Sequence, residues 1–192
     1  MSSRSDDSHD ARSDRYLVLG FLCLVALIAY IQRAALSVPQ NEVASDLGFT
    51  SLGMGMGAIF SCWYFTYAVL QLPSGRFADR IGSRRALAIL CVLWSVATLL
   101  SGFATGFTSL FILWGLMGAA QAGAFPCAAK AIGQIFPESE RARASGLLAS
   151  GMMIGGAISP FLTGRLLELL RPTAASLHQQ PWRLLFGIYA LP

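Results

Sequence analysis

One basic side chain, that of Arg33, interrupts a stretch of sequence that carries no other charge. The sixteen residues of Tyr16–Ile31 are uncharged, and the uncharged Gln32 separates them from Arg33. The planar guanidinium group presents a fork of donors that matches a carboxylate or a phosphate in a bidentate way. We therefore expect Arg33 to bind a small anion.

Three further side chains with hydrogen-bonding groups lie close together later in the chain. Tyr64, Tyr67 and Gln71 fall on adjacent turns if residues 52–72 form a helix, so they are candidates for the lining of the same site. Aromatic residues in membrane helices more often serve packing or lie at the interface. Both interpretations stay open for these three residues.

Residue groups that would indicate an enzyme or a metalloprotein are absent from the sequence. There is no Ser-His-Asp arrangement, metal-ligand cluster or phosphate-binding loop, and neither His9 nor His178 has candidate partners nearby. The cysteines all fall in apolar stretches without CxxC spacing, which is typical of packing residues; they are Cys23, Cys62, Cys91 and Cys127. We expect no enzymatic activity, metal or cofactor.

The elements that must position these residues are predicted by where charges are missing. Residues 47–75, 86–129 and 144–164 contain no Asp, Glu, Lys or Arg over 29, 44 and 21 positions. A hydrocarbon core of about 30 Å requires about 20 helical residues, so the longest run holds two spans. With 55% hydrophobic and 12% charged residues, the chain is too apolar for an ordinary soluble domain.

The predicted fold is an all-α integral membrane bundle. Spans are expected at about 16–38, 52–72, 86–104, 107–129 and 144–167, and the first could continue past Pro39 toward Asp46. A sixth span at 182–192 is too short to cross a bilayer, so we expect a truncated helix and a missing carboxy-terminal half. Residues 1–14, rich in Ser, Asp and Arg, are predicted to form a disordered tail.

Two positions are open to Arg33 in such a bundle. At membrane depth a guanidinium costs at least about 2.5–3.5 kcal/mol, so it should face the bundle interior or a wet cavity. Alternatively, the first span ends early and the side chain extends to the outer interface. Only the first position favours an anion site within the membrane.

The distribution of basic residues predicts the orientation of the bundle. Ten Lys and Arg residues lie in the tail, the 2–3 loop and the 4–5 region, against three in the 5–6 region: Arg165, Arg171 and Arg183. This asymmetry puts the amino terminus in the cytoplasm of a multi-pass cell-membrane protein. The net charge of +4 therefore reflects membrane topology, and we do not expect nucleic acid as a partner.

Small residues recur at a spacing of four in two of the predicted spans. Gly151 and Gly155 form one such stripe, and Gly115, Ala119 and Gly123 form another. Small residues let helix backbones approach closely in lipid. The stripes are explained by tight packing alone or by surfaces that slide during a conformational change.

The loop between spans 2 and 3 contains an ordered motif. In order, the motif has a glycine, three residues, Asp-Arg, one residue, a second glycine, one residue and two arginines. The fixed positions of this pattern are Gly75, Asp79, Arg80, Gly82, Arg84 and Arg85. Gly75 and Gly82 permit a tight reversal, and the arginines can engage anionic lipid headgroups. Asp79 is suited to accept charge-assisted hydrogen bonds from neighbouring arginines or to lie at a helix amino terminus.

This motif resembles the cytoplasmic signature of the major facilitator superfamily. A second stretch, with Pro137, Glu140, Arg141 and Gly146, resembles the link between spans 4 and 5 in the anion:cation symporter family, which includes sugar-acid transporters. The resemblance covers about residues 25–192. It implies the amino-terminal half of a twelve-span transporter that works by alternating access. Together with Glu140 and Arg141, the loop motif would stabilise one of its two states.

The resemblance also extends the candidate site. The family's first span carries a Tyr-x-x-Arg arrangement used for substrate, which Tyr30 and Arg33 match. Where sugar-acid members commonly carry two carboxylates, this sequence has Gln32 and Gln121, which form hydrogen bonds but cannot titrate. We therefore expect exchange, facilitated diffusion or coupling to an ion other than the proton, unless the missing half supplies a carboxylate.

The expected function is transport of a small organic anion, such as a sugar acid or another carboxylate. The expected partners are this solute, the lipid bilayer and the missing six-helix half. An organophosphate:phosphate exchanger is the second possibility, because that branch also has an arginine in span 1 and does not need the carboxylates. A membrane fragment without transport activity is the third.

Overall fold

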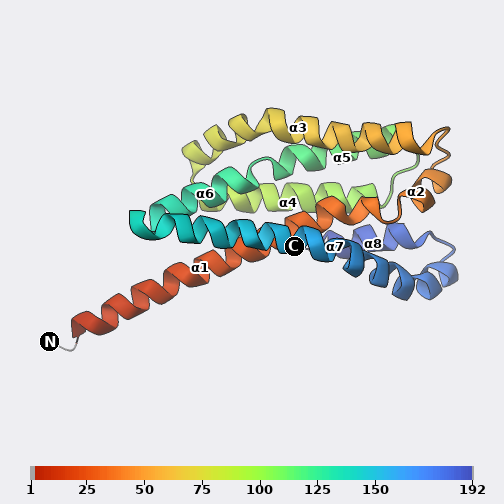
Figure 1. The fold of residues 1–192 in the computed structure, drawn as a ribbon. Coiled ribbons are helices and arrows are strands. Elements are labelled where there is room, and N and C mark those ends of the chain that lie inside the picture. Colours follow the sequence, from red (N-terminus) through yellow and green to blue (C-terminus); the bar gives the residue numbers. More distant parts are fainter. Residues whose placement is uncertain (1–2, 192) are drawn as a thin grey trace.

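The structure, a computed structural model, describes the backbone of residues 3–191 and the side chains of residues 14–191. The described residues form helices and no strand (Figure 1). In chain order the elements are α1 (Ser3–Ala34), the 3-10 turn η1 (Ala35–Ser37), α2 (Gln40–Asp46), α3 (Leu52–Ile81), α4 (Ser83–Ser101), α5 (Phe107–Gln121), α6 (Ala124–Ile135), α7 (Glu138–Ser176) and α8 (Pro181–Tyr189). The predicted all-α fold class is confirmed.

Five helical segments are long and apolar enough to cross a membrane. They are Asp14–Ser37, Leu52–Ile81, Ser83–Ser101, Phe107–Ile135 and Glu138–Ser176. Each overlaps one predicted span, and α3 and α7 run beyond the apolar stretches into flanking polar residues. Helix α8 has nine residues, which at about 1.5 Å per residue is shorter than a hydrocarbon core.

The amino-terminal part of α1 lies in the predicted tail. The helix begins at Ser3, within the segment 1–14 that was predicted to be a disordered tail. Once a helix has formed, each further residue adds one hydrogen bond at little cost, which accounts for the extension. Residues 1–2 and the side chains of residues 3–13, which include Arg4, His9 and Arg12, lie outside the described part of the chain. Disorder of the tail stays a prediction.

One span is interrupted near its middle, and the helix of another ends shortly before a proline. Pro126 has no N–H to donate to the carbonyl of Ala122, so α5 ends at Gln121 and α6 begins at Ala124. Helix α1 ends at Ala34, because Pro39 likewise cannot donate to the carbonyl of Ala35. Arg33 and Gln121 are therefore both at helix ends inside the bundle.

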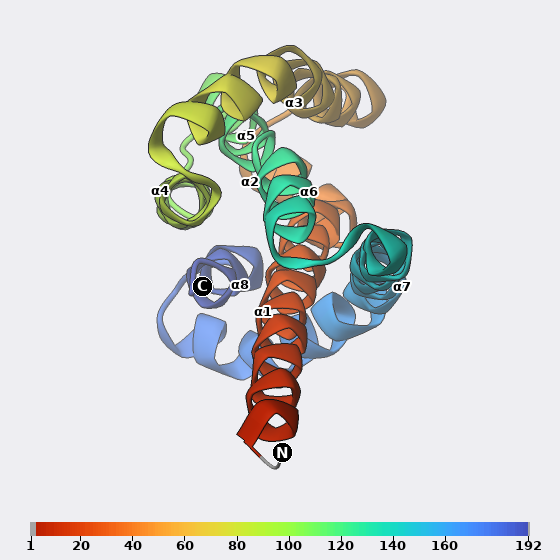
Figure 2. The same cartoon turned by 90° about the vertical axis from the view of Figure 1, so that its left-hand side faces the viewer.

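The helices pack in pairs around α1. Helix α1 lies along α7, α3 lies along α5, α4 contacts α5 and α6, and α8 contacts α7 and α4. In the end-on view, α1 lies between α7 at the right and α8 at the left, and α3 and α5 lie at the top (Figure 2). The largest buried side chains of the core include Trp63, Trp114 and Trp182.

Glycines allow the closest of these helix contacts. A Cβ on Gly155 would collide with the backbone oxygen of Leu27 on α1, and one on Gly118 would collide with the backbone oxygen of Trp63 on α3. These contacts agree with the tight packing expected of small residues in membrane helices. A role as sliding surfaces stays a prediction.

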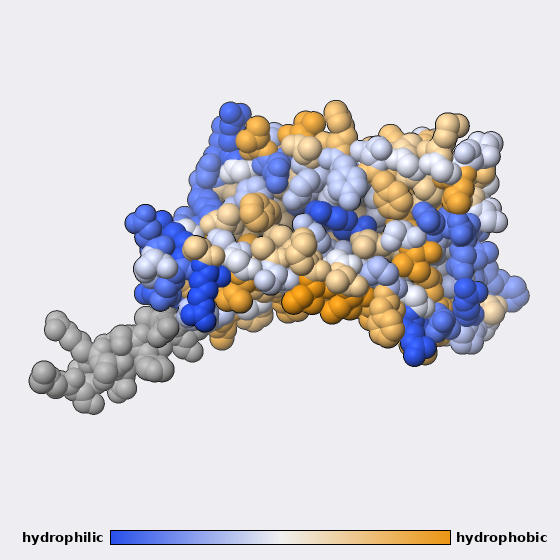
Figure 3. All heavy atoms as spheres, viewed as in Figure 1, coloured by the Kyte–Doolittle hydropathy of each residue, from blue (hydrophilic) through white to orange (hydrophobic). Residues whose placement is uncertain are grey.

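The outer surface of the bundle is apolar between two polar ends. Hydrophilic residues gather at the ends of the molecule, with hydrophobic side chains between them (Figure 3). Large side chains on α3 and α7 are more than two thirds exposed, among them Phe65, Leu72, Phe161 and Leu169. A soluble protein does not expose such a surface, whereas a bilayer covers it.

Candidate functional site

Arg33 lies in the last turn of α1, and aromatic rings surround its guanidinium group. The Cζ atom lies 4.1 Å from the centre of the Trp63 ring, 4.4 Å from that of Tyr30 and 4.9 Å from that of Tyr67. The rings of Trp63 and Tyr67 are themselves stacked, with centroids 5.0 Å apart and planes at 15°. We call these three rings the aromatic cage.

Helical spacing explains how two elements build the cage. Trp63 and Tyr67 are four residues apart on α3, and Tyr30 precedes Arg33 by three residues on α1. Residues at these spacings lie on the same face of a helix, one turn apart. The two faces meet because α1 and α3 both contribute to the same hydrophobic core, which includes Ala29, Ile31 and Ile59.

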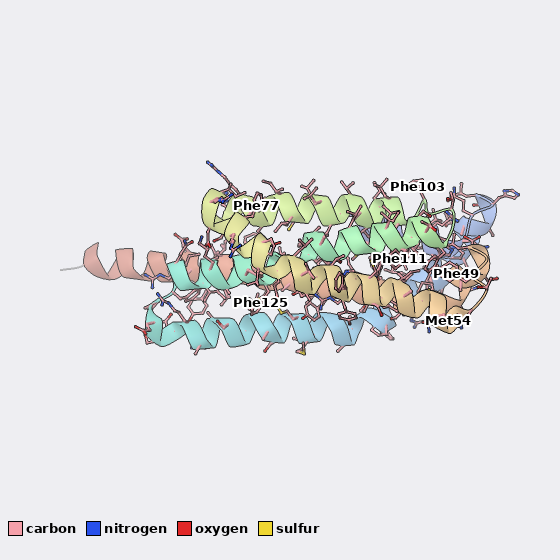
Figure 4. All side chains as sticks on the ribbon, turned by 90° about the horizontal axis from the view of Figure 1, so that it is seen from above. Phe49, Met54, Phe77, Phe103, Phe111 and Phe125 are labelled. Atoms are coloured by element: carbon pink, nitrogen blue, oxygen red, sulfur yellow. The ribbon has the colours of Figure 1, made fainter. Side chains whose placement is uncertain are left out.

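The cage lies near the middle of α3 along the bundle axis. Met54 and Phe77, from the two ends of this helix, lie at opposite ends of the bundle (Figure 4). Trp63 follows Leu52, the first residue of α3, by 11 positions, which is about 16 Å of helix. A half-bilayer core is about 15 Å thick. The geometry therefore favours Arg33 at depth in the bundle and not at the ends.

The aromatic cage can offset the cost of a charged group at this depth. A cation over an aromatic face gains about 0.5–1 kcal/mol when exposed and about 2 kcal/mol or more when desolvated. Three such rings supply a stabilisation similar to the insertion cost of about 2.5–3.5 kcal/mol. The Nε atom of Arg33 is buried and has no hydrogen-bond partner among the described residues.

Two cavities meet at Arg33. The first, which we call the α1–α6 cavity, runs along α1 from Leu22 to Arg33 and is also lined by Tyr67, Gln121, Phe125 and Met152. The second, the α1–α3 cavity, continues from Tyr30 and Arg33 to Ser37 and is also lined by Phe60, Trp63, Tyr64 and Trp114. Tyr30 and Arg33 line both, so the guanidinium lies between two cavities that extend in opposite directions along α1.

Gln121 joins Arg33 in the α1–α6 cavity. Its side chain is 1% exposed, and its Nε2 donates to the backbone oxygen of Ala29 on α1 over 3.4 Å. Its Oε1 atom is buried without a partner among the described residues. The structure thus places Gln121 where the sequence analysis expected a site residue.

Gln32 does not share this position. Its Nε2 donates to the backbone oxygen of Tyr189 on α8, and its side chain lines neither cavity. Successive residues of an α-helix point about 100° apart, because the helix has 3.6 residues per turn. Gln32 therefore faces the packed core while its neighbour Arg33 faces the cavities, and its contact with a ligand stays a prediction.

The other predicted residues of α3 divide in the same way. Tyr67 belongs to the cage, and Tyr64 lines the α1–α3 cavity with its ring edge against Trp63. Gln71 is partly buried and lines neither cavity.

The sequence analysis missed two residues that shape the site. Trp63 makes the shortest of the three contacts to Arg33, and its i, i+4 relation to Tyr67 was the available signal. Ser159 on α7 is fully buried and donates its Oγ hydrogen to the backbone oxygen of Ile31 over 2.8 Å. This bond, with that of Gln121, fixes the end of α1 that carries Arg33; no local pattern indicated it.

The loop motif adopts only part of the predicted geometry. Gly82 joins α3 to α4 with a φ of 89°, a conformation that favours glycine, so the predicted reversal is present there. Gly75 instead lies inside α3, within 4.0 Å of Pro126 on α6 if a Cβ is added. Its predicted place in the reversal is wrong, because α3 stays helical to Ile81.

Asp79 pairs with a lysine and not with the neighbouring arginines. Its Oδ1 atom accepts a hydrogen bond from Lys130 Nζ on α6 over 2.7 Å, and the same ammonium group donates to the backbone oxygen of Ala78. Asp79 lies in the last turn of α3, so its predicted place at a helix amino terminus is also wrong. The remaining arginines of the motif are exposed: Arg80, Arg84 and Arg85.

The second motif begins α7. Glu140 lies in the first turn, where a carboxylate is favoured by the helix dipole, and one of its oxygens is buried without a partner among the described residues. Arg141 donates from Nε to the backbone oxygen of Phe136 over 3.1 Å and so closes the turn between α6 and α7.

Ion pairs at the other polar end hold α2 against α7 and α8. Arg183 contacts Asp46 through both Nε and Nη2, at 3.2 and 2.8 Å, and Arg171 contacts Glu42 at 2.8 Å. Both acids belong to α2, one turn apart. These pairs fix the segment that follows Arg33 in the chain.

Comparison with known proteins assigns the chain to a family. The model of the Major Facilitator Superfamily matches residues 22–192. The fold resembles two solved inward-facing structures of a bacterial homologue of the human lysosomal transporter Spinster. The TM-score is 0.83 for the unoccupied structure and 0.80 for the occupied one, and the sequence identity is 22% for both. Each match covers 93% of this chain and 40% or 42% of that one, and at this identity it shows the fold alone.

Three relatives are similar in sequence. The probable sulfoacetate transporter of Cupriavidus necator is 37% identical over 146 residues, and the D-galactonate transporter of Escherichia coli is 40% identical over 149. The hexuronate transporter of Bacillus subtilis is 33% identical over 151. The matches cover 76%, 77% and 79% of this chain, which spans about a third of each relative's length (34%, 34% and 35%). The predicted resemblance is confirmed: the chain belongs to the Major Facilitator Superfamily.

Proposed function

We propose that the complete protein transports small organic anions, of the carboxylate class, across the cell membrane by alternating access. The observation that carries this proposal is the guanidinium of Arg33, which lies near the middle of α3 between two cavities. A carrier requires a site at mid-depth that alternating access can expose to one side of the membrane at a time.

The aromatic cage supports a carboxylate as the group that is recognised. The rings contact the guanidinium carbon of Arg33, and its Nε has no partner among the described residues. The N–H groups of a guanidinium match a carboxylate in a bidentate way. Arg33 is the only basic residue among those that line the two cavities. A single cation balances a monoanionic group better than a phosphate dianion, which favours organic acids over organophosphates.

The relatives support the same class of substrate. Their names describe carriers of sulfoacetate, galactonate, galactarate or glucarate, and hexuronate, all of which are organic acids. This chain is 32–40% identical to these proteins. The missing carboxy-terminal half remains part of the proposal, since the chain matches about a third of their length.

We further propose that the proton is not the coupling ion of this half. Neither cavity is lined by Asp or Glu. The resemblance to sugar-acid carriers implies that Gln32 and Gln121 replace carboxylates that those carriers commonly have. An amide keeps the hydrogen bonding of a carboxylate but cannot take up a proton at physiological pH. Exchange, facilitated diffusion or coupling to another ion fits this arrangement.

The gating residues and the orientation complete the proposal. Asp79 and Lys130 join α3 to α6 at one polar end, where we place the cytoplasm on the basis of the ten basic residues predicted there. Opening of this end would separate helices of one half from the other. In our proposal these residues together stabilise one of the two states; they are Asp79, Arg80, Gly82, Arg84, Arg85, Glu140 and Arg141.

Uptake into proteoliposomes tests the function. The complete protein is reconstituted, and uptake of radiolabelled D-galactonate is measured for the wild type, for Arg33→Ala and for Arg165→Ala. Arg165 is an exposed arginine on α7 that pairs with Glu168, outside both cavities, and serves as the matched control. We expect Arg33→Ala to abolish uptake and Arg165→Ala to retain it. Full uptake by Arg33→Ala, or preference of the wild type for organophosphates, would overturn the proposal.

A further inference from the structure

The hydroxyl group of Thr66 joins α3 to α5 beside the aromatic cage. Its Oγ1 atom lies 2.8 Å from the backbone oxygen of Gly115 on α5, and 3.0 Å from the backbone oxygens of Cys62 and Trp63 on its own helix. A hydroxyl group has one hydrogen to donate, and the contact with Gly115 is the shortest of the three. Threonine hydroxyls form such bonds between helices in membrane bundles. We therefore assign the hydrogen of Thr66 to the bond with α5.

Two glycines of α5 bring the helices close enough for this bond. Helix α5 lies along α3 (Figure 1). A Cβ on Gly118 would collide with the backbone oxygen of Trp63 and would lie 2.6 Å from Oγ1 of Thr66, and one on Gly115 would lie 2.8 Å from Sγ of Cys62. Because Gly115 and Gly118 are three residues apart, they share a face of α5. This face packs directly on the turn of α3 that carries Trp63 and Thr66.

The same part of α3 carries two of the three rings of the cage. Trp63 precedes Thr66 by three residues, and Tyr67 follows it directly. The two rings contact Arg33 on α1, at 4.1 and 4.9 Å from its Cζ atom, whereas the Thr66 hydroxyl contacts α5. Side chains of one helical turn have fixed directions relative to each other. A rotation of α3 that breaks the Thr66 bond would therefore also turn the rings away from the guanidinium group.

We propose that Thr66 is a positioning residue, whose hydroxyl bond to α5 holds Trp63 and Tyr67 on the guanidinium group of Arg33. This inference rests on the proposed function, in which Arg33 binds the carboxylate of the substrate. Thr66 lines neither cavity, so it acts through the rings and not by contact with the substrate. Loss of the hydroxyl group alone should therefore weaken substrate binding.

Replacement of Thr66 by residues of similar size tests the inference by transport. Thr66→Val exchanges the hydroxyl group for a methyl group, and Thr66→Ser keeps the hydroxyl group. Uptake of D-galactonate by the complete protein is measured in proteoliposomes. We expect Thr66→Val to raise the KM by about three- to tenfold, the factor that corresponds to one hydrogen bond, with a smaller change in the maximal rate. In Thr66→Ser the KM should stay within about twofold of the wild-type value.

Thr98→Val is the matched control. Thr98 is 1% exposed, donates to the backbone oxygen of Trp94 and contacts Sδ of Met117 on α5, but lines neither cavity. The variant removes the same group from the contact between α4 and α5, and we expect the wild-type KM. In a Trp63→Leu background, which lacks one of the rings through which Thr66 acts, most of the effect of Thr66→Val on the KM should disappear.

Chemical modification of Arg33 gives a second measurement that does not depend on transport. Phenylglyoxal, a dicarbonyl that reacts with guanidinium groups, is added to the complete purified protein, and mass spectrometry follows the peptide that contains Arg33. The rings shield this group, so we expect Thr66→Val to raise the modification rate by about threefold or more. Thr66→Ser and Thr98→Val should keep the wild-type rate. Thr66→Ala, which also lacks the hydroxyl group, replaces Thr66→Val if the yield of that variant is low.

The outcomes separate this inference from the proposed function. An unchanged modification rate of Arg33 in Thr66→Val, or an equal increase in Thr66→Ser or Thr98→Val, would overturn the inference. So would a wild-type KM in Thr66→Val. If the wild type does not take up D-galactonate but Thr66→Val still raises the modification rate of Arg33, the positioning role stands and the proposed function fails.

Discussion

Replacement of Trp63 by leucine tests whether the aromatic cage prepares Arg33 for an anion. The Trp63 ring makes the shortest cage contact, at 4.1 Å from the guanidinium carbon, and also stacks on Tyr67. Its side chain is 1% exposed, so the contact with Arg33 is desolvated. Loss of a desolvated cation–π contact corresponds to about 1–2 kcal/mol.

This energy sets the expected change in affinity. Without the ring, the Arg33 side chain is free to adopt other rotamers. The substrate must then orient the guanidinium as it binds, and the free energy that this requires weakens binding. A difference of about 1.4 kcal/mol is tenfold in a binding constant. We therefore expect Trp63→Leu to raise the KM for organic acid uptake by roughly five- to thirtyfold, with a smaller change in the maximal rate.

Trp94→Leu is the matched control for this experiment. Trp94 is also buried, at 2% exposure, but it lies on α4 and lines neither cavity. Both variants lose a large core side chain, and we expect similar losses of thermal stability. Uptake by reconstituted protein and thermal unfolding are measured for both. The reasoning is refuted if Trp63→Leu keeps the wild-type KM, or if Trp94→Leu raises the KM equally.

Three further predictions concern the ion pair, the packing and the coupling. Asp79→Asn removes the ion pair with Lys130. Because the Asp79 side chain is 68% exposed, we expect the free energy of unfolding to fall by at most about 1 kcal/mol. We expect the transport rate to fall as well. A double variant with Lys130→Met that is no slower than either single variant would show that the two act as a pair, and additive losses would argue against it. Gly155→Leu forces its side chain against the Leu27 backbone, so we expect a loss of folded protein in size-exclusion chromatography, and normal yield would contradict the packing. Gln121→Glu adds a titratable carboxyl group to the cavity of Arg33; its ionised form competes with the substrate, so uptake should rise as pH falls, over a range in which the substrate stays ionised. A pH profile equal to that of the wild type would contradict this.

The membrane bundle could be predicted from sequence because the relevant physics is local. A charge-free run of about 20 residues has few alternatives to a membrane helix, and each of the five predicted spans has its counterpart in the structure. The interruptions after Ala34 and Gln121 were not predicted, although Pro39 and Pro126 were visible signals. A proline removes a hydrogen bond four residues earlier, so the break precedes the proline itself.

The site was only partly predictable because its contacts join distant segments. The position of Arg33 inside the bundle followed from the cost of a charge in an apolar helix. The different direction of its neighbour Gln32 follows from the turn of the helix. Asp79 was assigned to nearby arginines, whereas its partner Lys130 is 51 residues away in the chain. Likewise, the bond of Ser159 to Ile31 crosses 128 positions, and no local pattern reports such a contact.

The most direct test of the central claim is a structure of the complete protein with a bound sugar acid. The account predicts that the carboxylate lies within hydrogen-bond distance, about 3 Å, of the Arg33 guanidinium, with the aromatic cage on the faces of that group. A bound acid held elsewhere, with Arg33 at the polar end of the bundle, would contradict it.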